Sequence, residues 1–383
     1  MAGIKKFQTG NVLLISISHL LHDIYSSFLA PILPLLIEKL SLSYSLVGLL
    51  TIIQRLPSLL NPFVGLLADK MQVRYLIIIT PAVTAVVMSL LGSAPTFTVL
   101  AILLFVMGLS AALFHVPAPV MIRKISGAKT GKGMSFYMLG GEIARTLGPL
   151  IILGAVSIWG LEGTYKLIPF GLLASVILYF RLRKIKISED MRSNKMGVGI
   201  RKTISNLIPF FVVLSGIVFF RAFMKSALST FLPTYFTVQG ESLWAGGIAL
   251  AVLQFAGAIG TLFSGSISDR IGRKSTLIII SIASPVLMWL FTFSNDLFTI
   301  PLLVIMGFFL FASGPVLLAL VQDRSNERPS LINGIFLTIS FSASSITIML
   351  VGLLGDKFGL ELTFRIAALI ALMAIPFTLM LKE

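Results

Sequence analysis

The sequence consists of apolar runs about 20 residues long or longer, separated by short charged or Gly/Pro-rich junctions. An α-helix of that length crosses the hydrocarbon core of a membrane, which is about 30 Å thick. Strands are excluded because the runs lack two-residue alternation and lipid-facing backbone must hydrogen-bond internally. Charged residues make up only 12% of the chain, too few for a water-facing surface. We therefore expect an all-α membrane protein.

The junctions predict twelve transmembrane helices in two bundles of six. Lys5 and Lys6 precede the first run, but that run is too long for a signal peptide and is taken as the first span. The N-terminal bundle is expected over 1–184, a cytoplasmic linker over 185–204 and the C-terminal bundle over 205–383. The expected helices are 12–37, 45–68, 75–93, 97–122, 132–157, 163–181, 205–236, 242–268, 275–294, 298–321, 330–355 and 361–381.

One phrase occurs in both halves, with Asp69 and Asp269 lying 200 positions apart. The register extends to Gln54 and Gln254, which occupy the same place in the two copies. A duplicated polytopic bundle is typical of a transporter. The glycines, aspartates and arginines of the phrase, with Arg123 as a candidate partner of Asp69, are Gly65, Asp69, Arg74, Arg123, Gly265, Asp269, Arg270 and Arg273.

Basic residues indicate the orientation of the spans. The termini and the central loop share one side, which collects most of the Lys and Arg residues, and only Lys39, Lys166, Lys357 and Arg365 fall on the other. The positive-inside rule therefore predicts that both termini are cytoplasmic, in the inner membrane of the cell. The net charge of +15 reflects this topology and does not indicate a nucleic-acid partner. The chain has no cysteine, which excludes disulfides and thiolate metal sites.

The repeated phrase, Gly-x-x-x-Asp-(Arg/Lys)-x-Gly-Arg-(Arg/Lys), resembles the signature loop of the major facilitator superfamily. The second copy matches it fully, whereas the first has Gln72-Val73-Arg74 in place of the later Gly-Arg. With twelve spans and a basic central loop, the resemblance covers essentially the whole chain. It implies alternating access, with the repeated residues forming cytoplasmic gates near helix ends rather than substrate contacts.

A narrower resemblance is to the fosmidomycin-resistance-like branch of efflux proteins. It rests on His19-Leu-Leu-His22-Asp23-Ile-Tyr25 running into Phe28-Leu-Ala-Pro31-Ile-Leu-Pro34, on Phe114-His115, and on Gly140-Gly141 followed by Gly148-Pro149. The last pair also resembles part of an antiporter motif. The branch usually lacks an acidic residue after the glycine pair, whereas Glu142 and Arg145 stand here, so its substrate is not carried over.

Ionisable residues inside the spans mark the candidate site, because each is costly in lipid and should face the bundle interior. His19 and Asp23 are four positions apart on one helix face, with His22 beside them. We expect Asp23, Glu142, His22 and His19 to be the proton-coupling residues, although Glu142 and Arg145, three apart, are also placed to pair. The residues expected to contact substrate are Arg145, Arg221, Lys225, Arg55, His115, Tyr25, Gln54 and Gln254.

Four of the intramembrane side chains are cationic and two are carboxylates, so an anionic substrate would supply the missing negative charge. The sequence therefore predicts a monomeric secondary transporter with a small amphipathic or anionic substrate, driven by protons in antiport. A proton symporter importing an organic anion has the same charge requirements, and a lipid flippase is a further alternative. No nucleophile–base pair or metal constellation is apparent, so we expect no enzyme activity, cofactor or metal site.

Overall fold

The computed structural model describes residues 7–61, 64, 73–127, 130–183, 200–323 and 329–381. Every regular element within these ranges is a helix, which confirms the predicted all-α class. The contacts divide the chain into two compact units: Met1–Leu42, Leu50–Met191 and Phe236–Ala251 form the first, and Ser43–Leu49, Arg192–Tyr235 and Val252–Glu383 form the second. The division into bundles at 184 and 205 stays a prediction.

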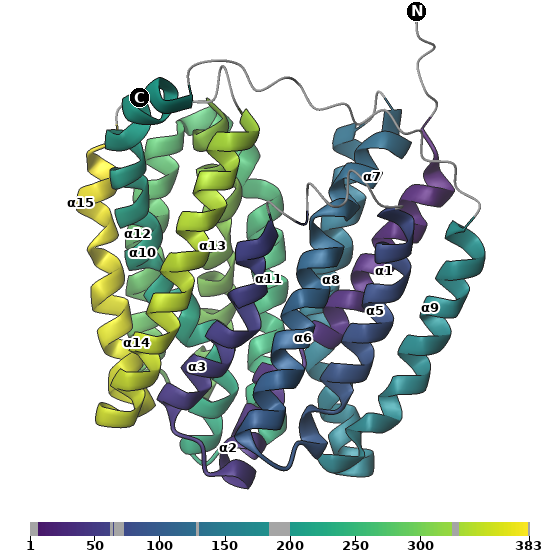
Figure 1. Ribbon diagram of the computed structural model, residues 1–383. Coiled ribbons are helices and arrows are strands. Elements are labelled where there is room, and N and C mark those ends of the chain that lie inside the picture. The colour runs from purple at the N-terminus through teal and green to yellow at the C-terminus, as the bar shows by residue number, and fades with distance from the viewer. Residues whose placement is uncertain are drawn as a thin grey trace, which may run out of the picture. The chain divides into compact units, whose positions relative to one another are not determined.

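The first unit is built around α1, which packs against α5, α8 and α9 (Figure 1). Its core is a cluster of buried side chains that includes Ile15, Ile77, Phe114, Ile122 and Leu178. The elements that lie wholly in this unit are α1 (Thr9–Ser26), α2 (Leu29–Leu40), η1 (Leu56–Leu60), α5 (Val73–Ser89), η2 (Leu91–Ser93), α6 (Phe97–His115), α7 (Pro117–Ser126), α8 (Thr130–Trp159), η4 (Glu162–Leu167) and α9 (Ile168–Leu182).

In the second unit, α12 packs against α13, α14 and α15 (Figure 1). Its core cluster includes Leu214, Leu277, Val316, Val321 and Ile332. Three further helices have residues in both units: α3 (Tyr44–Arg55), α10 (Ile200–Val238) and α11 (Leu243–Ile271). The helices wholly within the second unit are α12 (Arg273–Phe291), α13 (Asp296–Asp323), α14 (Pro329–Leu372) and α15 (Ala374–Leu379).

Ten of the described helical stretches are long and apolar enough to cross a membrane. Tyr44–Leu60 is a shorter apolar helix, and Ile335–Leu379 holds two predicted spans in one stretch of 45 residues. These two spans are separated at Gly359, whose backbone is not helical, with φ 75°. The glycine is suited to this position because a residue with a Cβ is strained at positive φ. The pattern is consistent with twelve helices.

The first predicted span, 12–37, is broken into α1 and α2. The Oγ atoms of Ser26 and Ser27 both donate to the carbonyl oxygen of Asp23, at 3.1 and 2.7 Å, and such bonds to the preceding turn bend helices. Pro31 lies in the first turn of α2, where its missing N–H has no intrahelical acceptor to lose. The break places the end of α1 immediately after Asp23 and Tyr25.

Glycines allow α8 to approach α1 closely. A Cβ on Gly140 would stand 2.5 Å from the carbonyl oxygen of Ser16, and one on Gly148 would stand 2.7 Å from Cβ of Ser27. A Cβ on Gly141 would stand 2.6 Å from Cε1 of His19. These distances are too short for real atoms, so the glycines quoted for the narrower resemblance fix the spacing of the two helices.

Within each unit, junctions predicted to share one side of the membrane lie together. Nζ of Lys39 donates to Oε1 of Glu162 at 2.7 Å and to the carbonyl oxygen of Gly92 at 2.9 Å. In the second unit, Arg365 pairs with Glu361 and donates to the carbonyl oxygen of Thr292. Both sets of contacts agree with the up-and-down order of the predicted spans.

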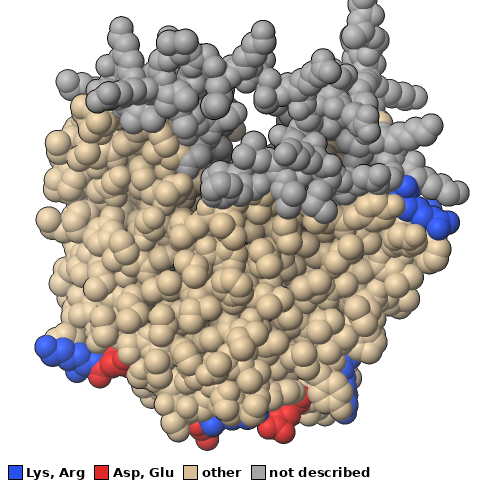
Figure 2. Space-filling model, in the orientation of Figure 1, with Lys and Arg blue, Asp and Glu red and all other residues tan. Residues whose placement is uncertain are grey.

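Charged side chains are few on the described part of the face that Figure 2 shows. Figure 2 shows that the charged residues described on this face gather near its lower edge and at one place near the upper edge, with a broad uncharged region between them. Many large apolar side chains are exposed, among them Ile158, Phe170, Phe255 and Leu262. An exposed apolar surface of this extent matches a protein surrounded by lipid.

Candidate functional site

Three histidines of the first unit surround the carboxylate of Asp23. His19, His22 and Asp23 lie on α1, and His115 is the last residue of α6, which ends there because Pro117 begins the next helix. The Nε2 atom of His19 lies 3.2 Å from Oδ2 of Asp23. On the other oxygen, Oδ1, Nδ1 of His22 lies at 3.1 Å and Nε2 of His115 at 3.3 Å.

The cluster is buried except on the side of His115. His22 is fully buried, His19 and Asp23 are 7% and 5% exposed, and the side chain of His115 is 40% exposed. A carboxylate in such a place must be hydrogen-bonded or neutralised, because an isolated buried charge costs several kcal/mol or more. The three imidazoles supply the hydrogen bonds, and the exposed His115 leaves a side from which protons can reach the acid.

Aromatic contacts hold the rings of the cluster in place. The ring of His19 stacks on Tyr137 of α8 with centroids 4.0 Å apart, and the ring of His22 stacks on Phe114 at 4.6 Å. Nδ1 of His19 bonds the carbonyl oxygen of Tyr137 at 2.7 Å, and Nδ1 of His115 lies 3.4 Å from the Tyr137 hydroxyl. Sequence reasoning missed Tyr137, because nothing in its local pattern indicates that α8 passes beside His19.

The donor atoms of His19, Asp23 and His115 all lie within 4.8 Å of one another. We assign this spacing to hydrogen bonds, since each histidine already contacts the carboxylate at a hydrogen-bonding distance. The prediction that the chain uses no metal ion or cofactor stays a prediction.

Three other predicted site residues of the first unit lie apart from this cluster. The hydroxyl of Tyr25 donates to the carbonyl oxygen of Leu167 at 2.8 Å, so it links α1 to η4. Nε2 of Gln54 lies 3.2 Å from Sδ of Met107, and Arg55 is exposed. Their predicted substrate contacts stay predictions.

Glu142 and Arg145 form the ion pair that their spacing on one helix allows, Arg145 Nη2 with Glu142 Oε1. The Glu142 side chain is 14% exposed and that of Arg145 is 41% exposed. Each of the two charges is therefore neutralised by a partner on its own helix, and neither needs a substrate for this. Their predicted coupling and binding roles stay predictions.

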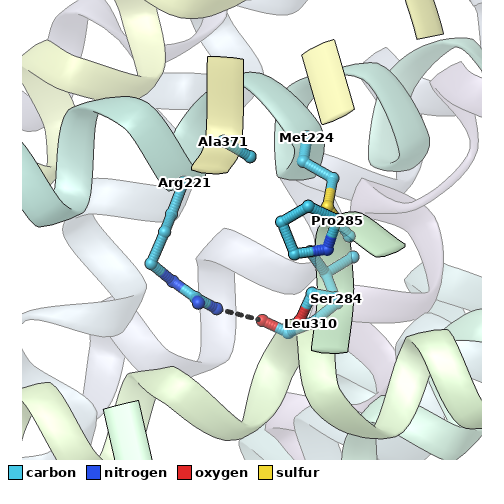
Figure 3. Close-up of a pocket in the computed structure, with 6 residues that line it drawn as sticks. All are labelled: Arg221, Met224, Ser284, Pro285, Leu310 and Ala371. Atoms are coloured by element: carbon cyan, nitrogen blue, oxygen red, sulfur yellow. Dashed lines mark hydrogen bonds between the residues drawn. The ribbon is translucent and has the colours of Figure 1, made fainter. Parts of the chain in front are cut away.

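In the second unit, Arg221 of α10 lies in a small pocket (Figure 3). The pocket is lined by Arg221, Met224, Ser284, Pro285, Leu310 and Ala371. Arg221 is 9% exposed, and its Nη2 donates to the carbonyl oxygen of Leu310 at 3.4 Å. Among the described residues it has no carboxylate partner, and the buried hydroxyl of Ser284 has no hydrogen-bond partner.

The two remaining predicted substrate residues of the second unit differ in burial. Lys225 is exposed one turn after Arg221, with Nζ 5.3 Å from the ring centroid of Phe311. Gln254 of α11 is 9% exposed, and its Oε1 has no hydrogen-bond partner within the described ranges. Only Gln254 of these two polar residues is buried.

The predicted gating residues of the second copy form a local network. Arg273 pairs with Asp269 at 2.5 Å, contacts Ser268, and reaches Oδ2 of Asp323 on α13 at 3.3 Å. Asp269 thus pairs with a basic residue of α12, and its gating role stays a prediction. A Cβ on Gly265 would meet no described atom within 4 Å.

The other predicted gating residues are either exposed or outside the described part of the chain. Arg270 is exposed. Gly65 and Asp69 of the first copy lie outside the described residues, as do the side chains of Arg74 and Arg123.

The sequence reasoning also missed Asp356 of α14. Its Oδ1 accepts from the backbone N–H of Tyr44 at 2.6 Å, and its Oδ2 from that of Ser45 at 2.9 Å. The carboxylate thus caps the N-terminus of α3, where the unsatisfied amides and the helix dipole favour a negative charge. The sequence shows only that Asp356 is an acidic residue on the side opposite the central loop, and this does not indicate which helix it caps.

Comparisons with known proteins agree with this fold. The family model of the Major Facilitator Superfamily matches residues 15–348. The fosmidomycin resistance protein of Escherichia coli (strain K12) is 27% identical over 94% of this chain and 89% of its own length. An uncharacterized MFS-type transporter of Bacillus subtilis (strain 168) is 23% identical, over 95% of this chain and 91% of its own.

Solved structures give the same fold. A bacterial homologue of the human lysosomal transporter Spinster, in an inward-facing and unoccupied conformation, has a TM-score of 0.82 at 16% identity, covering 98% of this chain and 97% of that one. A D-xylose–proton symporter has a TM-score of 0.77 at 14% identity, covering 99% and 98%. The chain therefore belongs to the Major Facilitator Superfamily and is an integral membrane transporter, not an enzyme.

Proposed function

We propose that the chain is a proton-coupled antiporter that exports a small amphipathic or anionic compound by alternating access. The observation that carries this proposal is Asp23, a buried carboxylate in a membrane span with three imidazoles on its two oxygens. Ionisable groups are costly in a membrane and mark ion or proton pathways in transporters. Histidine exchanges protons near neutral pH, so this cluster has the chemistry to load and release a coupling proton.

Export is the proposed direction for two reasons. One relative that covers nearly the whole chain is named for resistance to fosmidomycin, and removal of a compound from the cell is one way to resist it. In addition, Gly148 and Pro149 of α8 resemble part of an antiporter motif. A symporter importing an organic anion would need the same charges, so the direction is decided by the experiment below.

Arg221 supports an anionic group on the substrate. A guanidinium has five N–H donors and suits bidentate contacts to carboxylate or phosphate, yet Arg221 makes one long hydrogen bond, to a backbone carbonyl (Figure 3). The hydroxyl of Ser284 in the same pocket is a further donor without an assigned acceptor in the described part of the chain. An anionic group that reaches Arg221 would satisfy its remaining donors.

We further propose that the transporter lies in the cytoplasmic membrane as a monomer, with both termini in the cytoplasm. The support is the distribution of basic residues, which places Lys39, Lys166, Lys357 and Arg365 on the side opposite the central loop. Cysteine labelling of single sites in the cysteine-free chain tests this topology, because reagent added outside the cell should modify a cysteine at Lys357 and not one in the central loop.

The purified protein in liposomes tests coupling and direction together. An imposed pH gradient should drive a labelled anionic compound against the proton flow, and movement with the protons would establish symport instead. Asp23→Asn should abolish the response to the gradient while leaving downhill exchange of the compound. Normal gradient-driven transport by Asp23→Asn would overturn the assignment of Asp23.

Substrate charge is tested with Arg221→Gln and Arg145→Gln. We expect Arg221→Gln to weaken binding of anionic compounds by about 10-fold or more, the loss of one charged hydrogen-bonding partner, and to spare uncharged compounds. Unchanged transport of anionic compounds by the double variant would show that the substrate does not need these cations. Ligand-dependent thermal shifts identify candidate compounds, because a bound ligand stabilises the native state.

A further inference from the structure

The tautomer of His19 is fixed by its contact with α8. Nδ1 of His19 lies 2.7 Å from the backbone carbonyl oxygen of Tyr137, and a carbonyl oxygen can only accept a hydrogen bond. Nδ1 therefore carries a hydrogen and donates it. The stacking of the two rings, with planes 14° apart, holds this orientation. The nitrogen that faces Asp23 is consequently Nε2, 3.2 Å from Oδ2.

A neutral histidine has only one N–H, and in His19 it is used by Tyr137. A neutral Nε2 would present a lone pair to Oδ2 of an ionised carboxylate, which also has only lone pairs. Two acceptors that face each other at 3.2 Å in a buried place repel and leave both groups unsatisfied. The contact is a hydrogen bond only if one more proton is present, either on Nε2 of His19 or on Oδ2 of Asp23.

The other two histidines do not need an extra proton. Nδ1 of His22 can donate to Oδ1 from a neutral ring, since its Nε2 has no hydrogen-bond partner among the described residues. Nε2 of His115 can also donate to Oδ1, because its Nδ1 faces the Tyr137 hydroxyl, which can donate to it. Oδ1 can therefore accept hydrogen bonds from two neutral rings, and the extra proton belongs to the contact at Oδ2.

We propose that His19 and Asp23 together form a binding site for one proton, shared between Nε2 and Oδ2, with the Tyr137 carbonyl as the group that positions the ring. That this proton is the one coupled to transport rests on the proposed function. The titratable groups that face the pair are His22 on α1, His115 on α6 and Tyr137 on α8. In the described part of the chain, α5, α7 and α9 add no ion pair to Asp23.

Release of the proton removes a hydrogen bond within α1, since His19 and Asp23 both lie on that helix. Without it, Nε2 and Oδ2 are two facing acceptors, so the pair must separate or admit a new donor. The ring of His19 remains bonded to the Tyr137 carbonyl on α8, so its Nε2 stays directed at Asp23. Loss of the proton therefore changes the contacts of the Asp23 carboxylate.

The chain has only three histidines, so its ring nitrogens can be resolved by ¹⁵N NMR of histidine-labelled protein. The full-length protein is used in lipid at pH 7 with a chelator present, and the single variants His22→Gln and His115→Gln assign the signals. We expect neutral rings at positions 22 and 115. His19 should show either two protonated nitrogens or, with one, an infrared carboxylic-acid band of Asp23 that is lost in Asp23→Asn.

The inference is overturned if His19 has one protonated nitrogen and Asp23 shows no carboxylic-acid band. It is equally overturned if Asp23→Asn leaves both nitrogens of His19 protonated, because the amide of asparagine can donate to a neutral Nε2. The protonation states are read from the wild-type spectrum, and the variants serve to assign its signals. A protein with the expected spectrum that ignores a pH gradient would contradict the proposed function and leave the proton site intact.

Discussion

Gly141 lies so close to His19 that a Cβ on the glycine would stand 2.6 Å from Cε1 of the imidazole and 2.9 Å from Nε2. The contact sets the position of the ring against Asp23, because α8 also supplies the Tyr137 carbonyl that binds its other nitrogen. A side chain of any size at position 141 must therefore move His19, or α8, or both. The helix spacing and the geometry of the carboxylate cluster thus depend on one another.

Gly141→Ala should impair proton coupling by displacing His19. Overpacking of a buried site costs about 1–3 kcal/mol, so we also expect a lower thermal midpoint in lipid or detergent. Gly154→Ala, on the same helix, is the matched control, since a Cβ at Gly154 would meet no described atom within 4 Å. That variant should keep its coupling and gain up to about 1 kcal/mol from helix propensity. Full coupling in Gly141→Ala would show that the approach of α8 does not control the site.

Glu142→Gln should retain the response to a pH gradient, because Glu142 is paired with Arg145. The expected loss is in stability, by about 1 kcal/mol or less, and Glu142→Gln combined with Arg145→Gln should recover part of it. Gradient-driven transport and thermal unfolding of the two variants provide the measurements, with Asp23→Asn as the uncoupled reference. A Glu142→Gln protein as uncoupled as that reference would move the proton-carrying role to α8.

Tyr25→Phe should lower stability without changing the apparent affinity for substrate. The hydroxyl of Tyr25 is bonded to the Leu167 carbonyl, and loss of such a bond costs about 0.5–1.5 kcal/mol. Tyr165→Phe is the control, because the Tyr165 side chain is exposed and removal of its hydroxyl should hardly change stability. Thermal unfolding and a substrate titration separate the two effects. A rise in the KM of Tyr25→Phe would return this residue to the substrate site.

Arg273→Gln should slow transport more than it lowers stability. Arg273 contacts Asp269, Ser268 and Asp323, but both acids are more than half exposed, and exposed ion pairs are worth about 0–1 kcal/mol. Arg270→Gln is the comparison, since Arg270 is the exposed neighbour in the same phrase. Maximal transport rate and thermal midpoint are measured for both. Equal rates in the wild type and Arg273→Gln would rule out a gating role for this network.

Asp356→Ala should destabilise the N-terminal turn of α3, because two backbone amides lose a charged acceptor. Removing a helix cap costs about 0.5–2 kcal/mol, and Asp356→Asn, which keeps one acceptor, should cost less. Hydrogen exchange at residues 44–47 reports the local effect, and Lys357→Ala serves as the neighbouring control. Unchanged exchange in Asp356→Ala would show that the cap does not stabilise this end of the helix.

The sequence by itself determined the membrane class, the superfamily and the local pairs. Span length and apolarity are properties of single segments, so the helices can be predicted without knowing their neighbours. The same holds for pairs on one helix face: His19 with Asp23, and Glu142 with Arg145, meet because helical geometry brings residues three or four apart together. The break between α1 and α2 was not predicted, although the bonds from the Ser26 and Ser27 hydroxyls to the Asp23 carbonyl are also local.

Only the tertiary structure decided what else surrounds Asp23. His115 of α6 contacts Asp23, and Tyr137 of α8 binds the neighbouring His19. Both contacts depend on how those helices rotate and how closely they approach α1. Asp356 likewise meets Tyr44 and Ser45 across more than 300 positions of sequence. Such contacts follow from the packing of whole helix faces, which local periodicity does not specify. The sequence therefore supplied the acid, and the packing of α8 on α1 supplied the acceptor that sets where its proton lies.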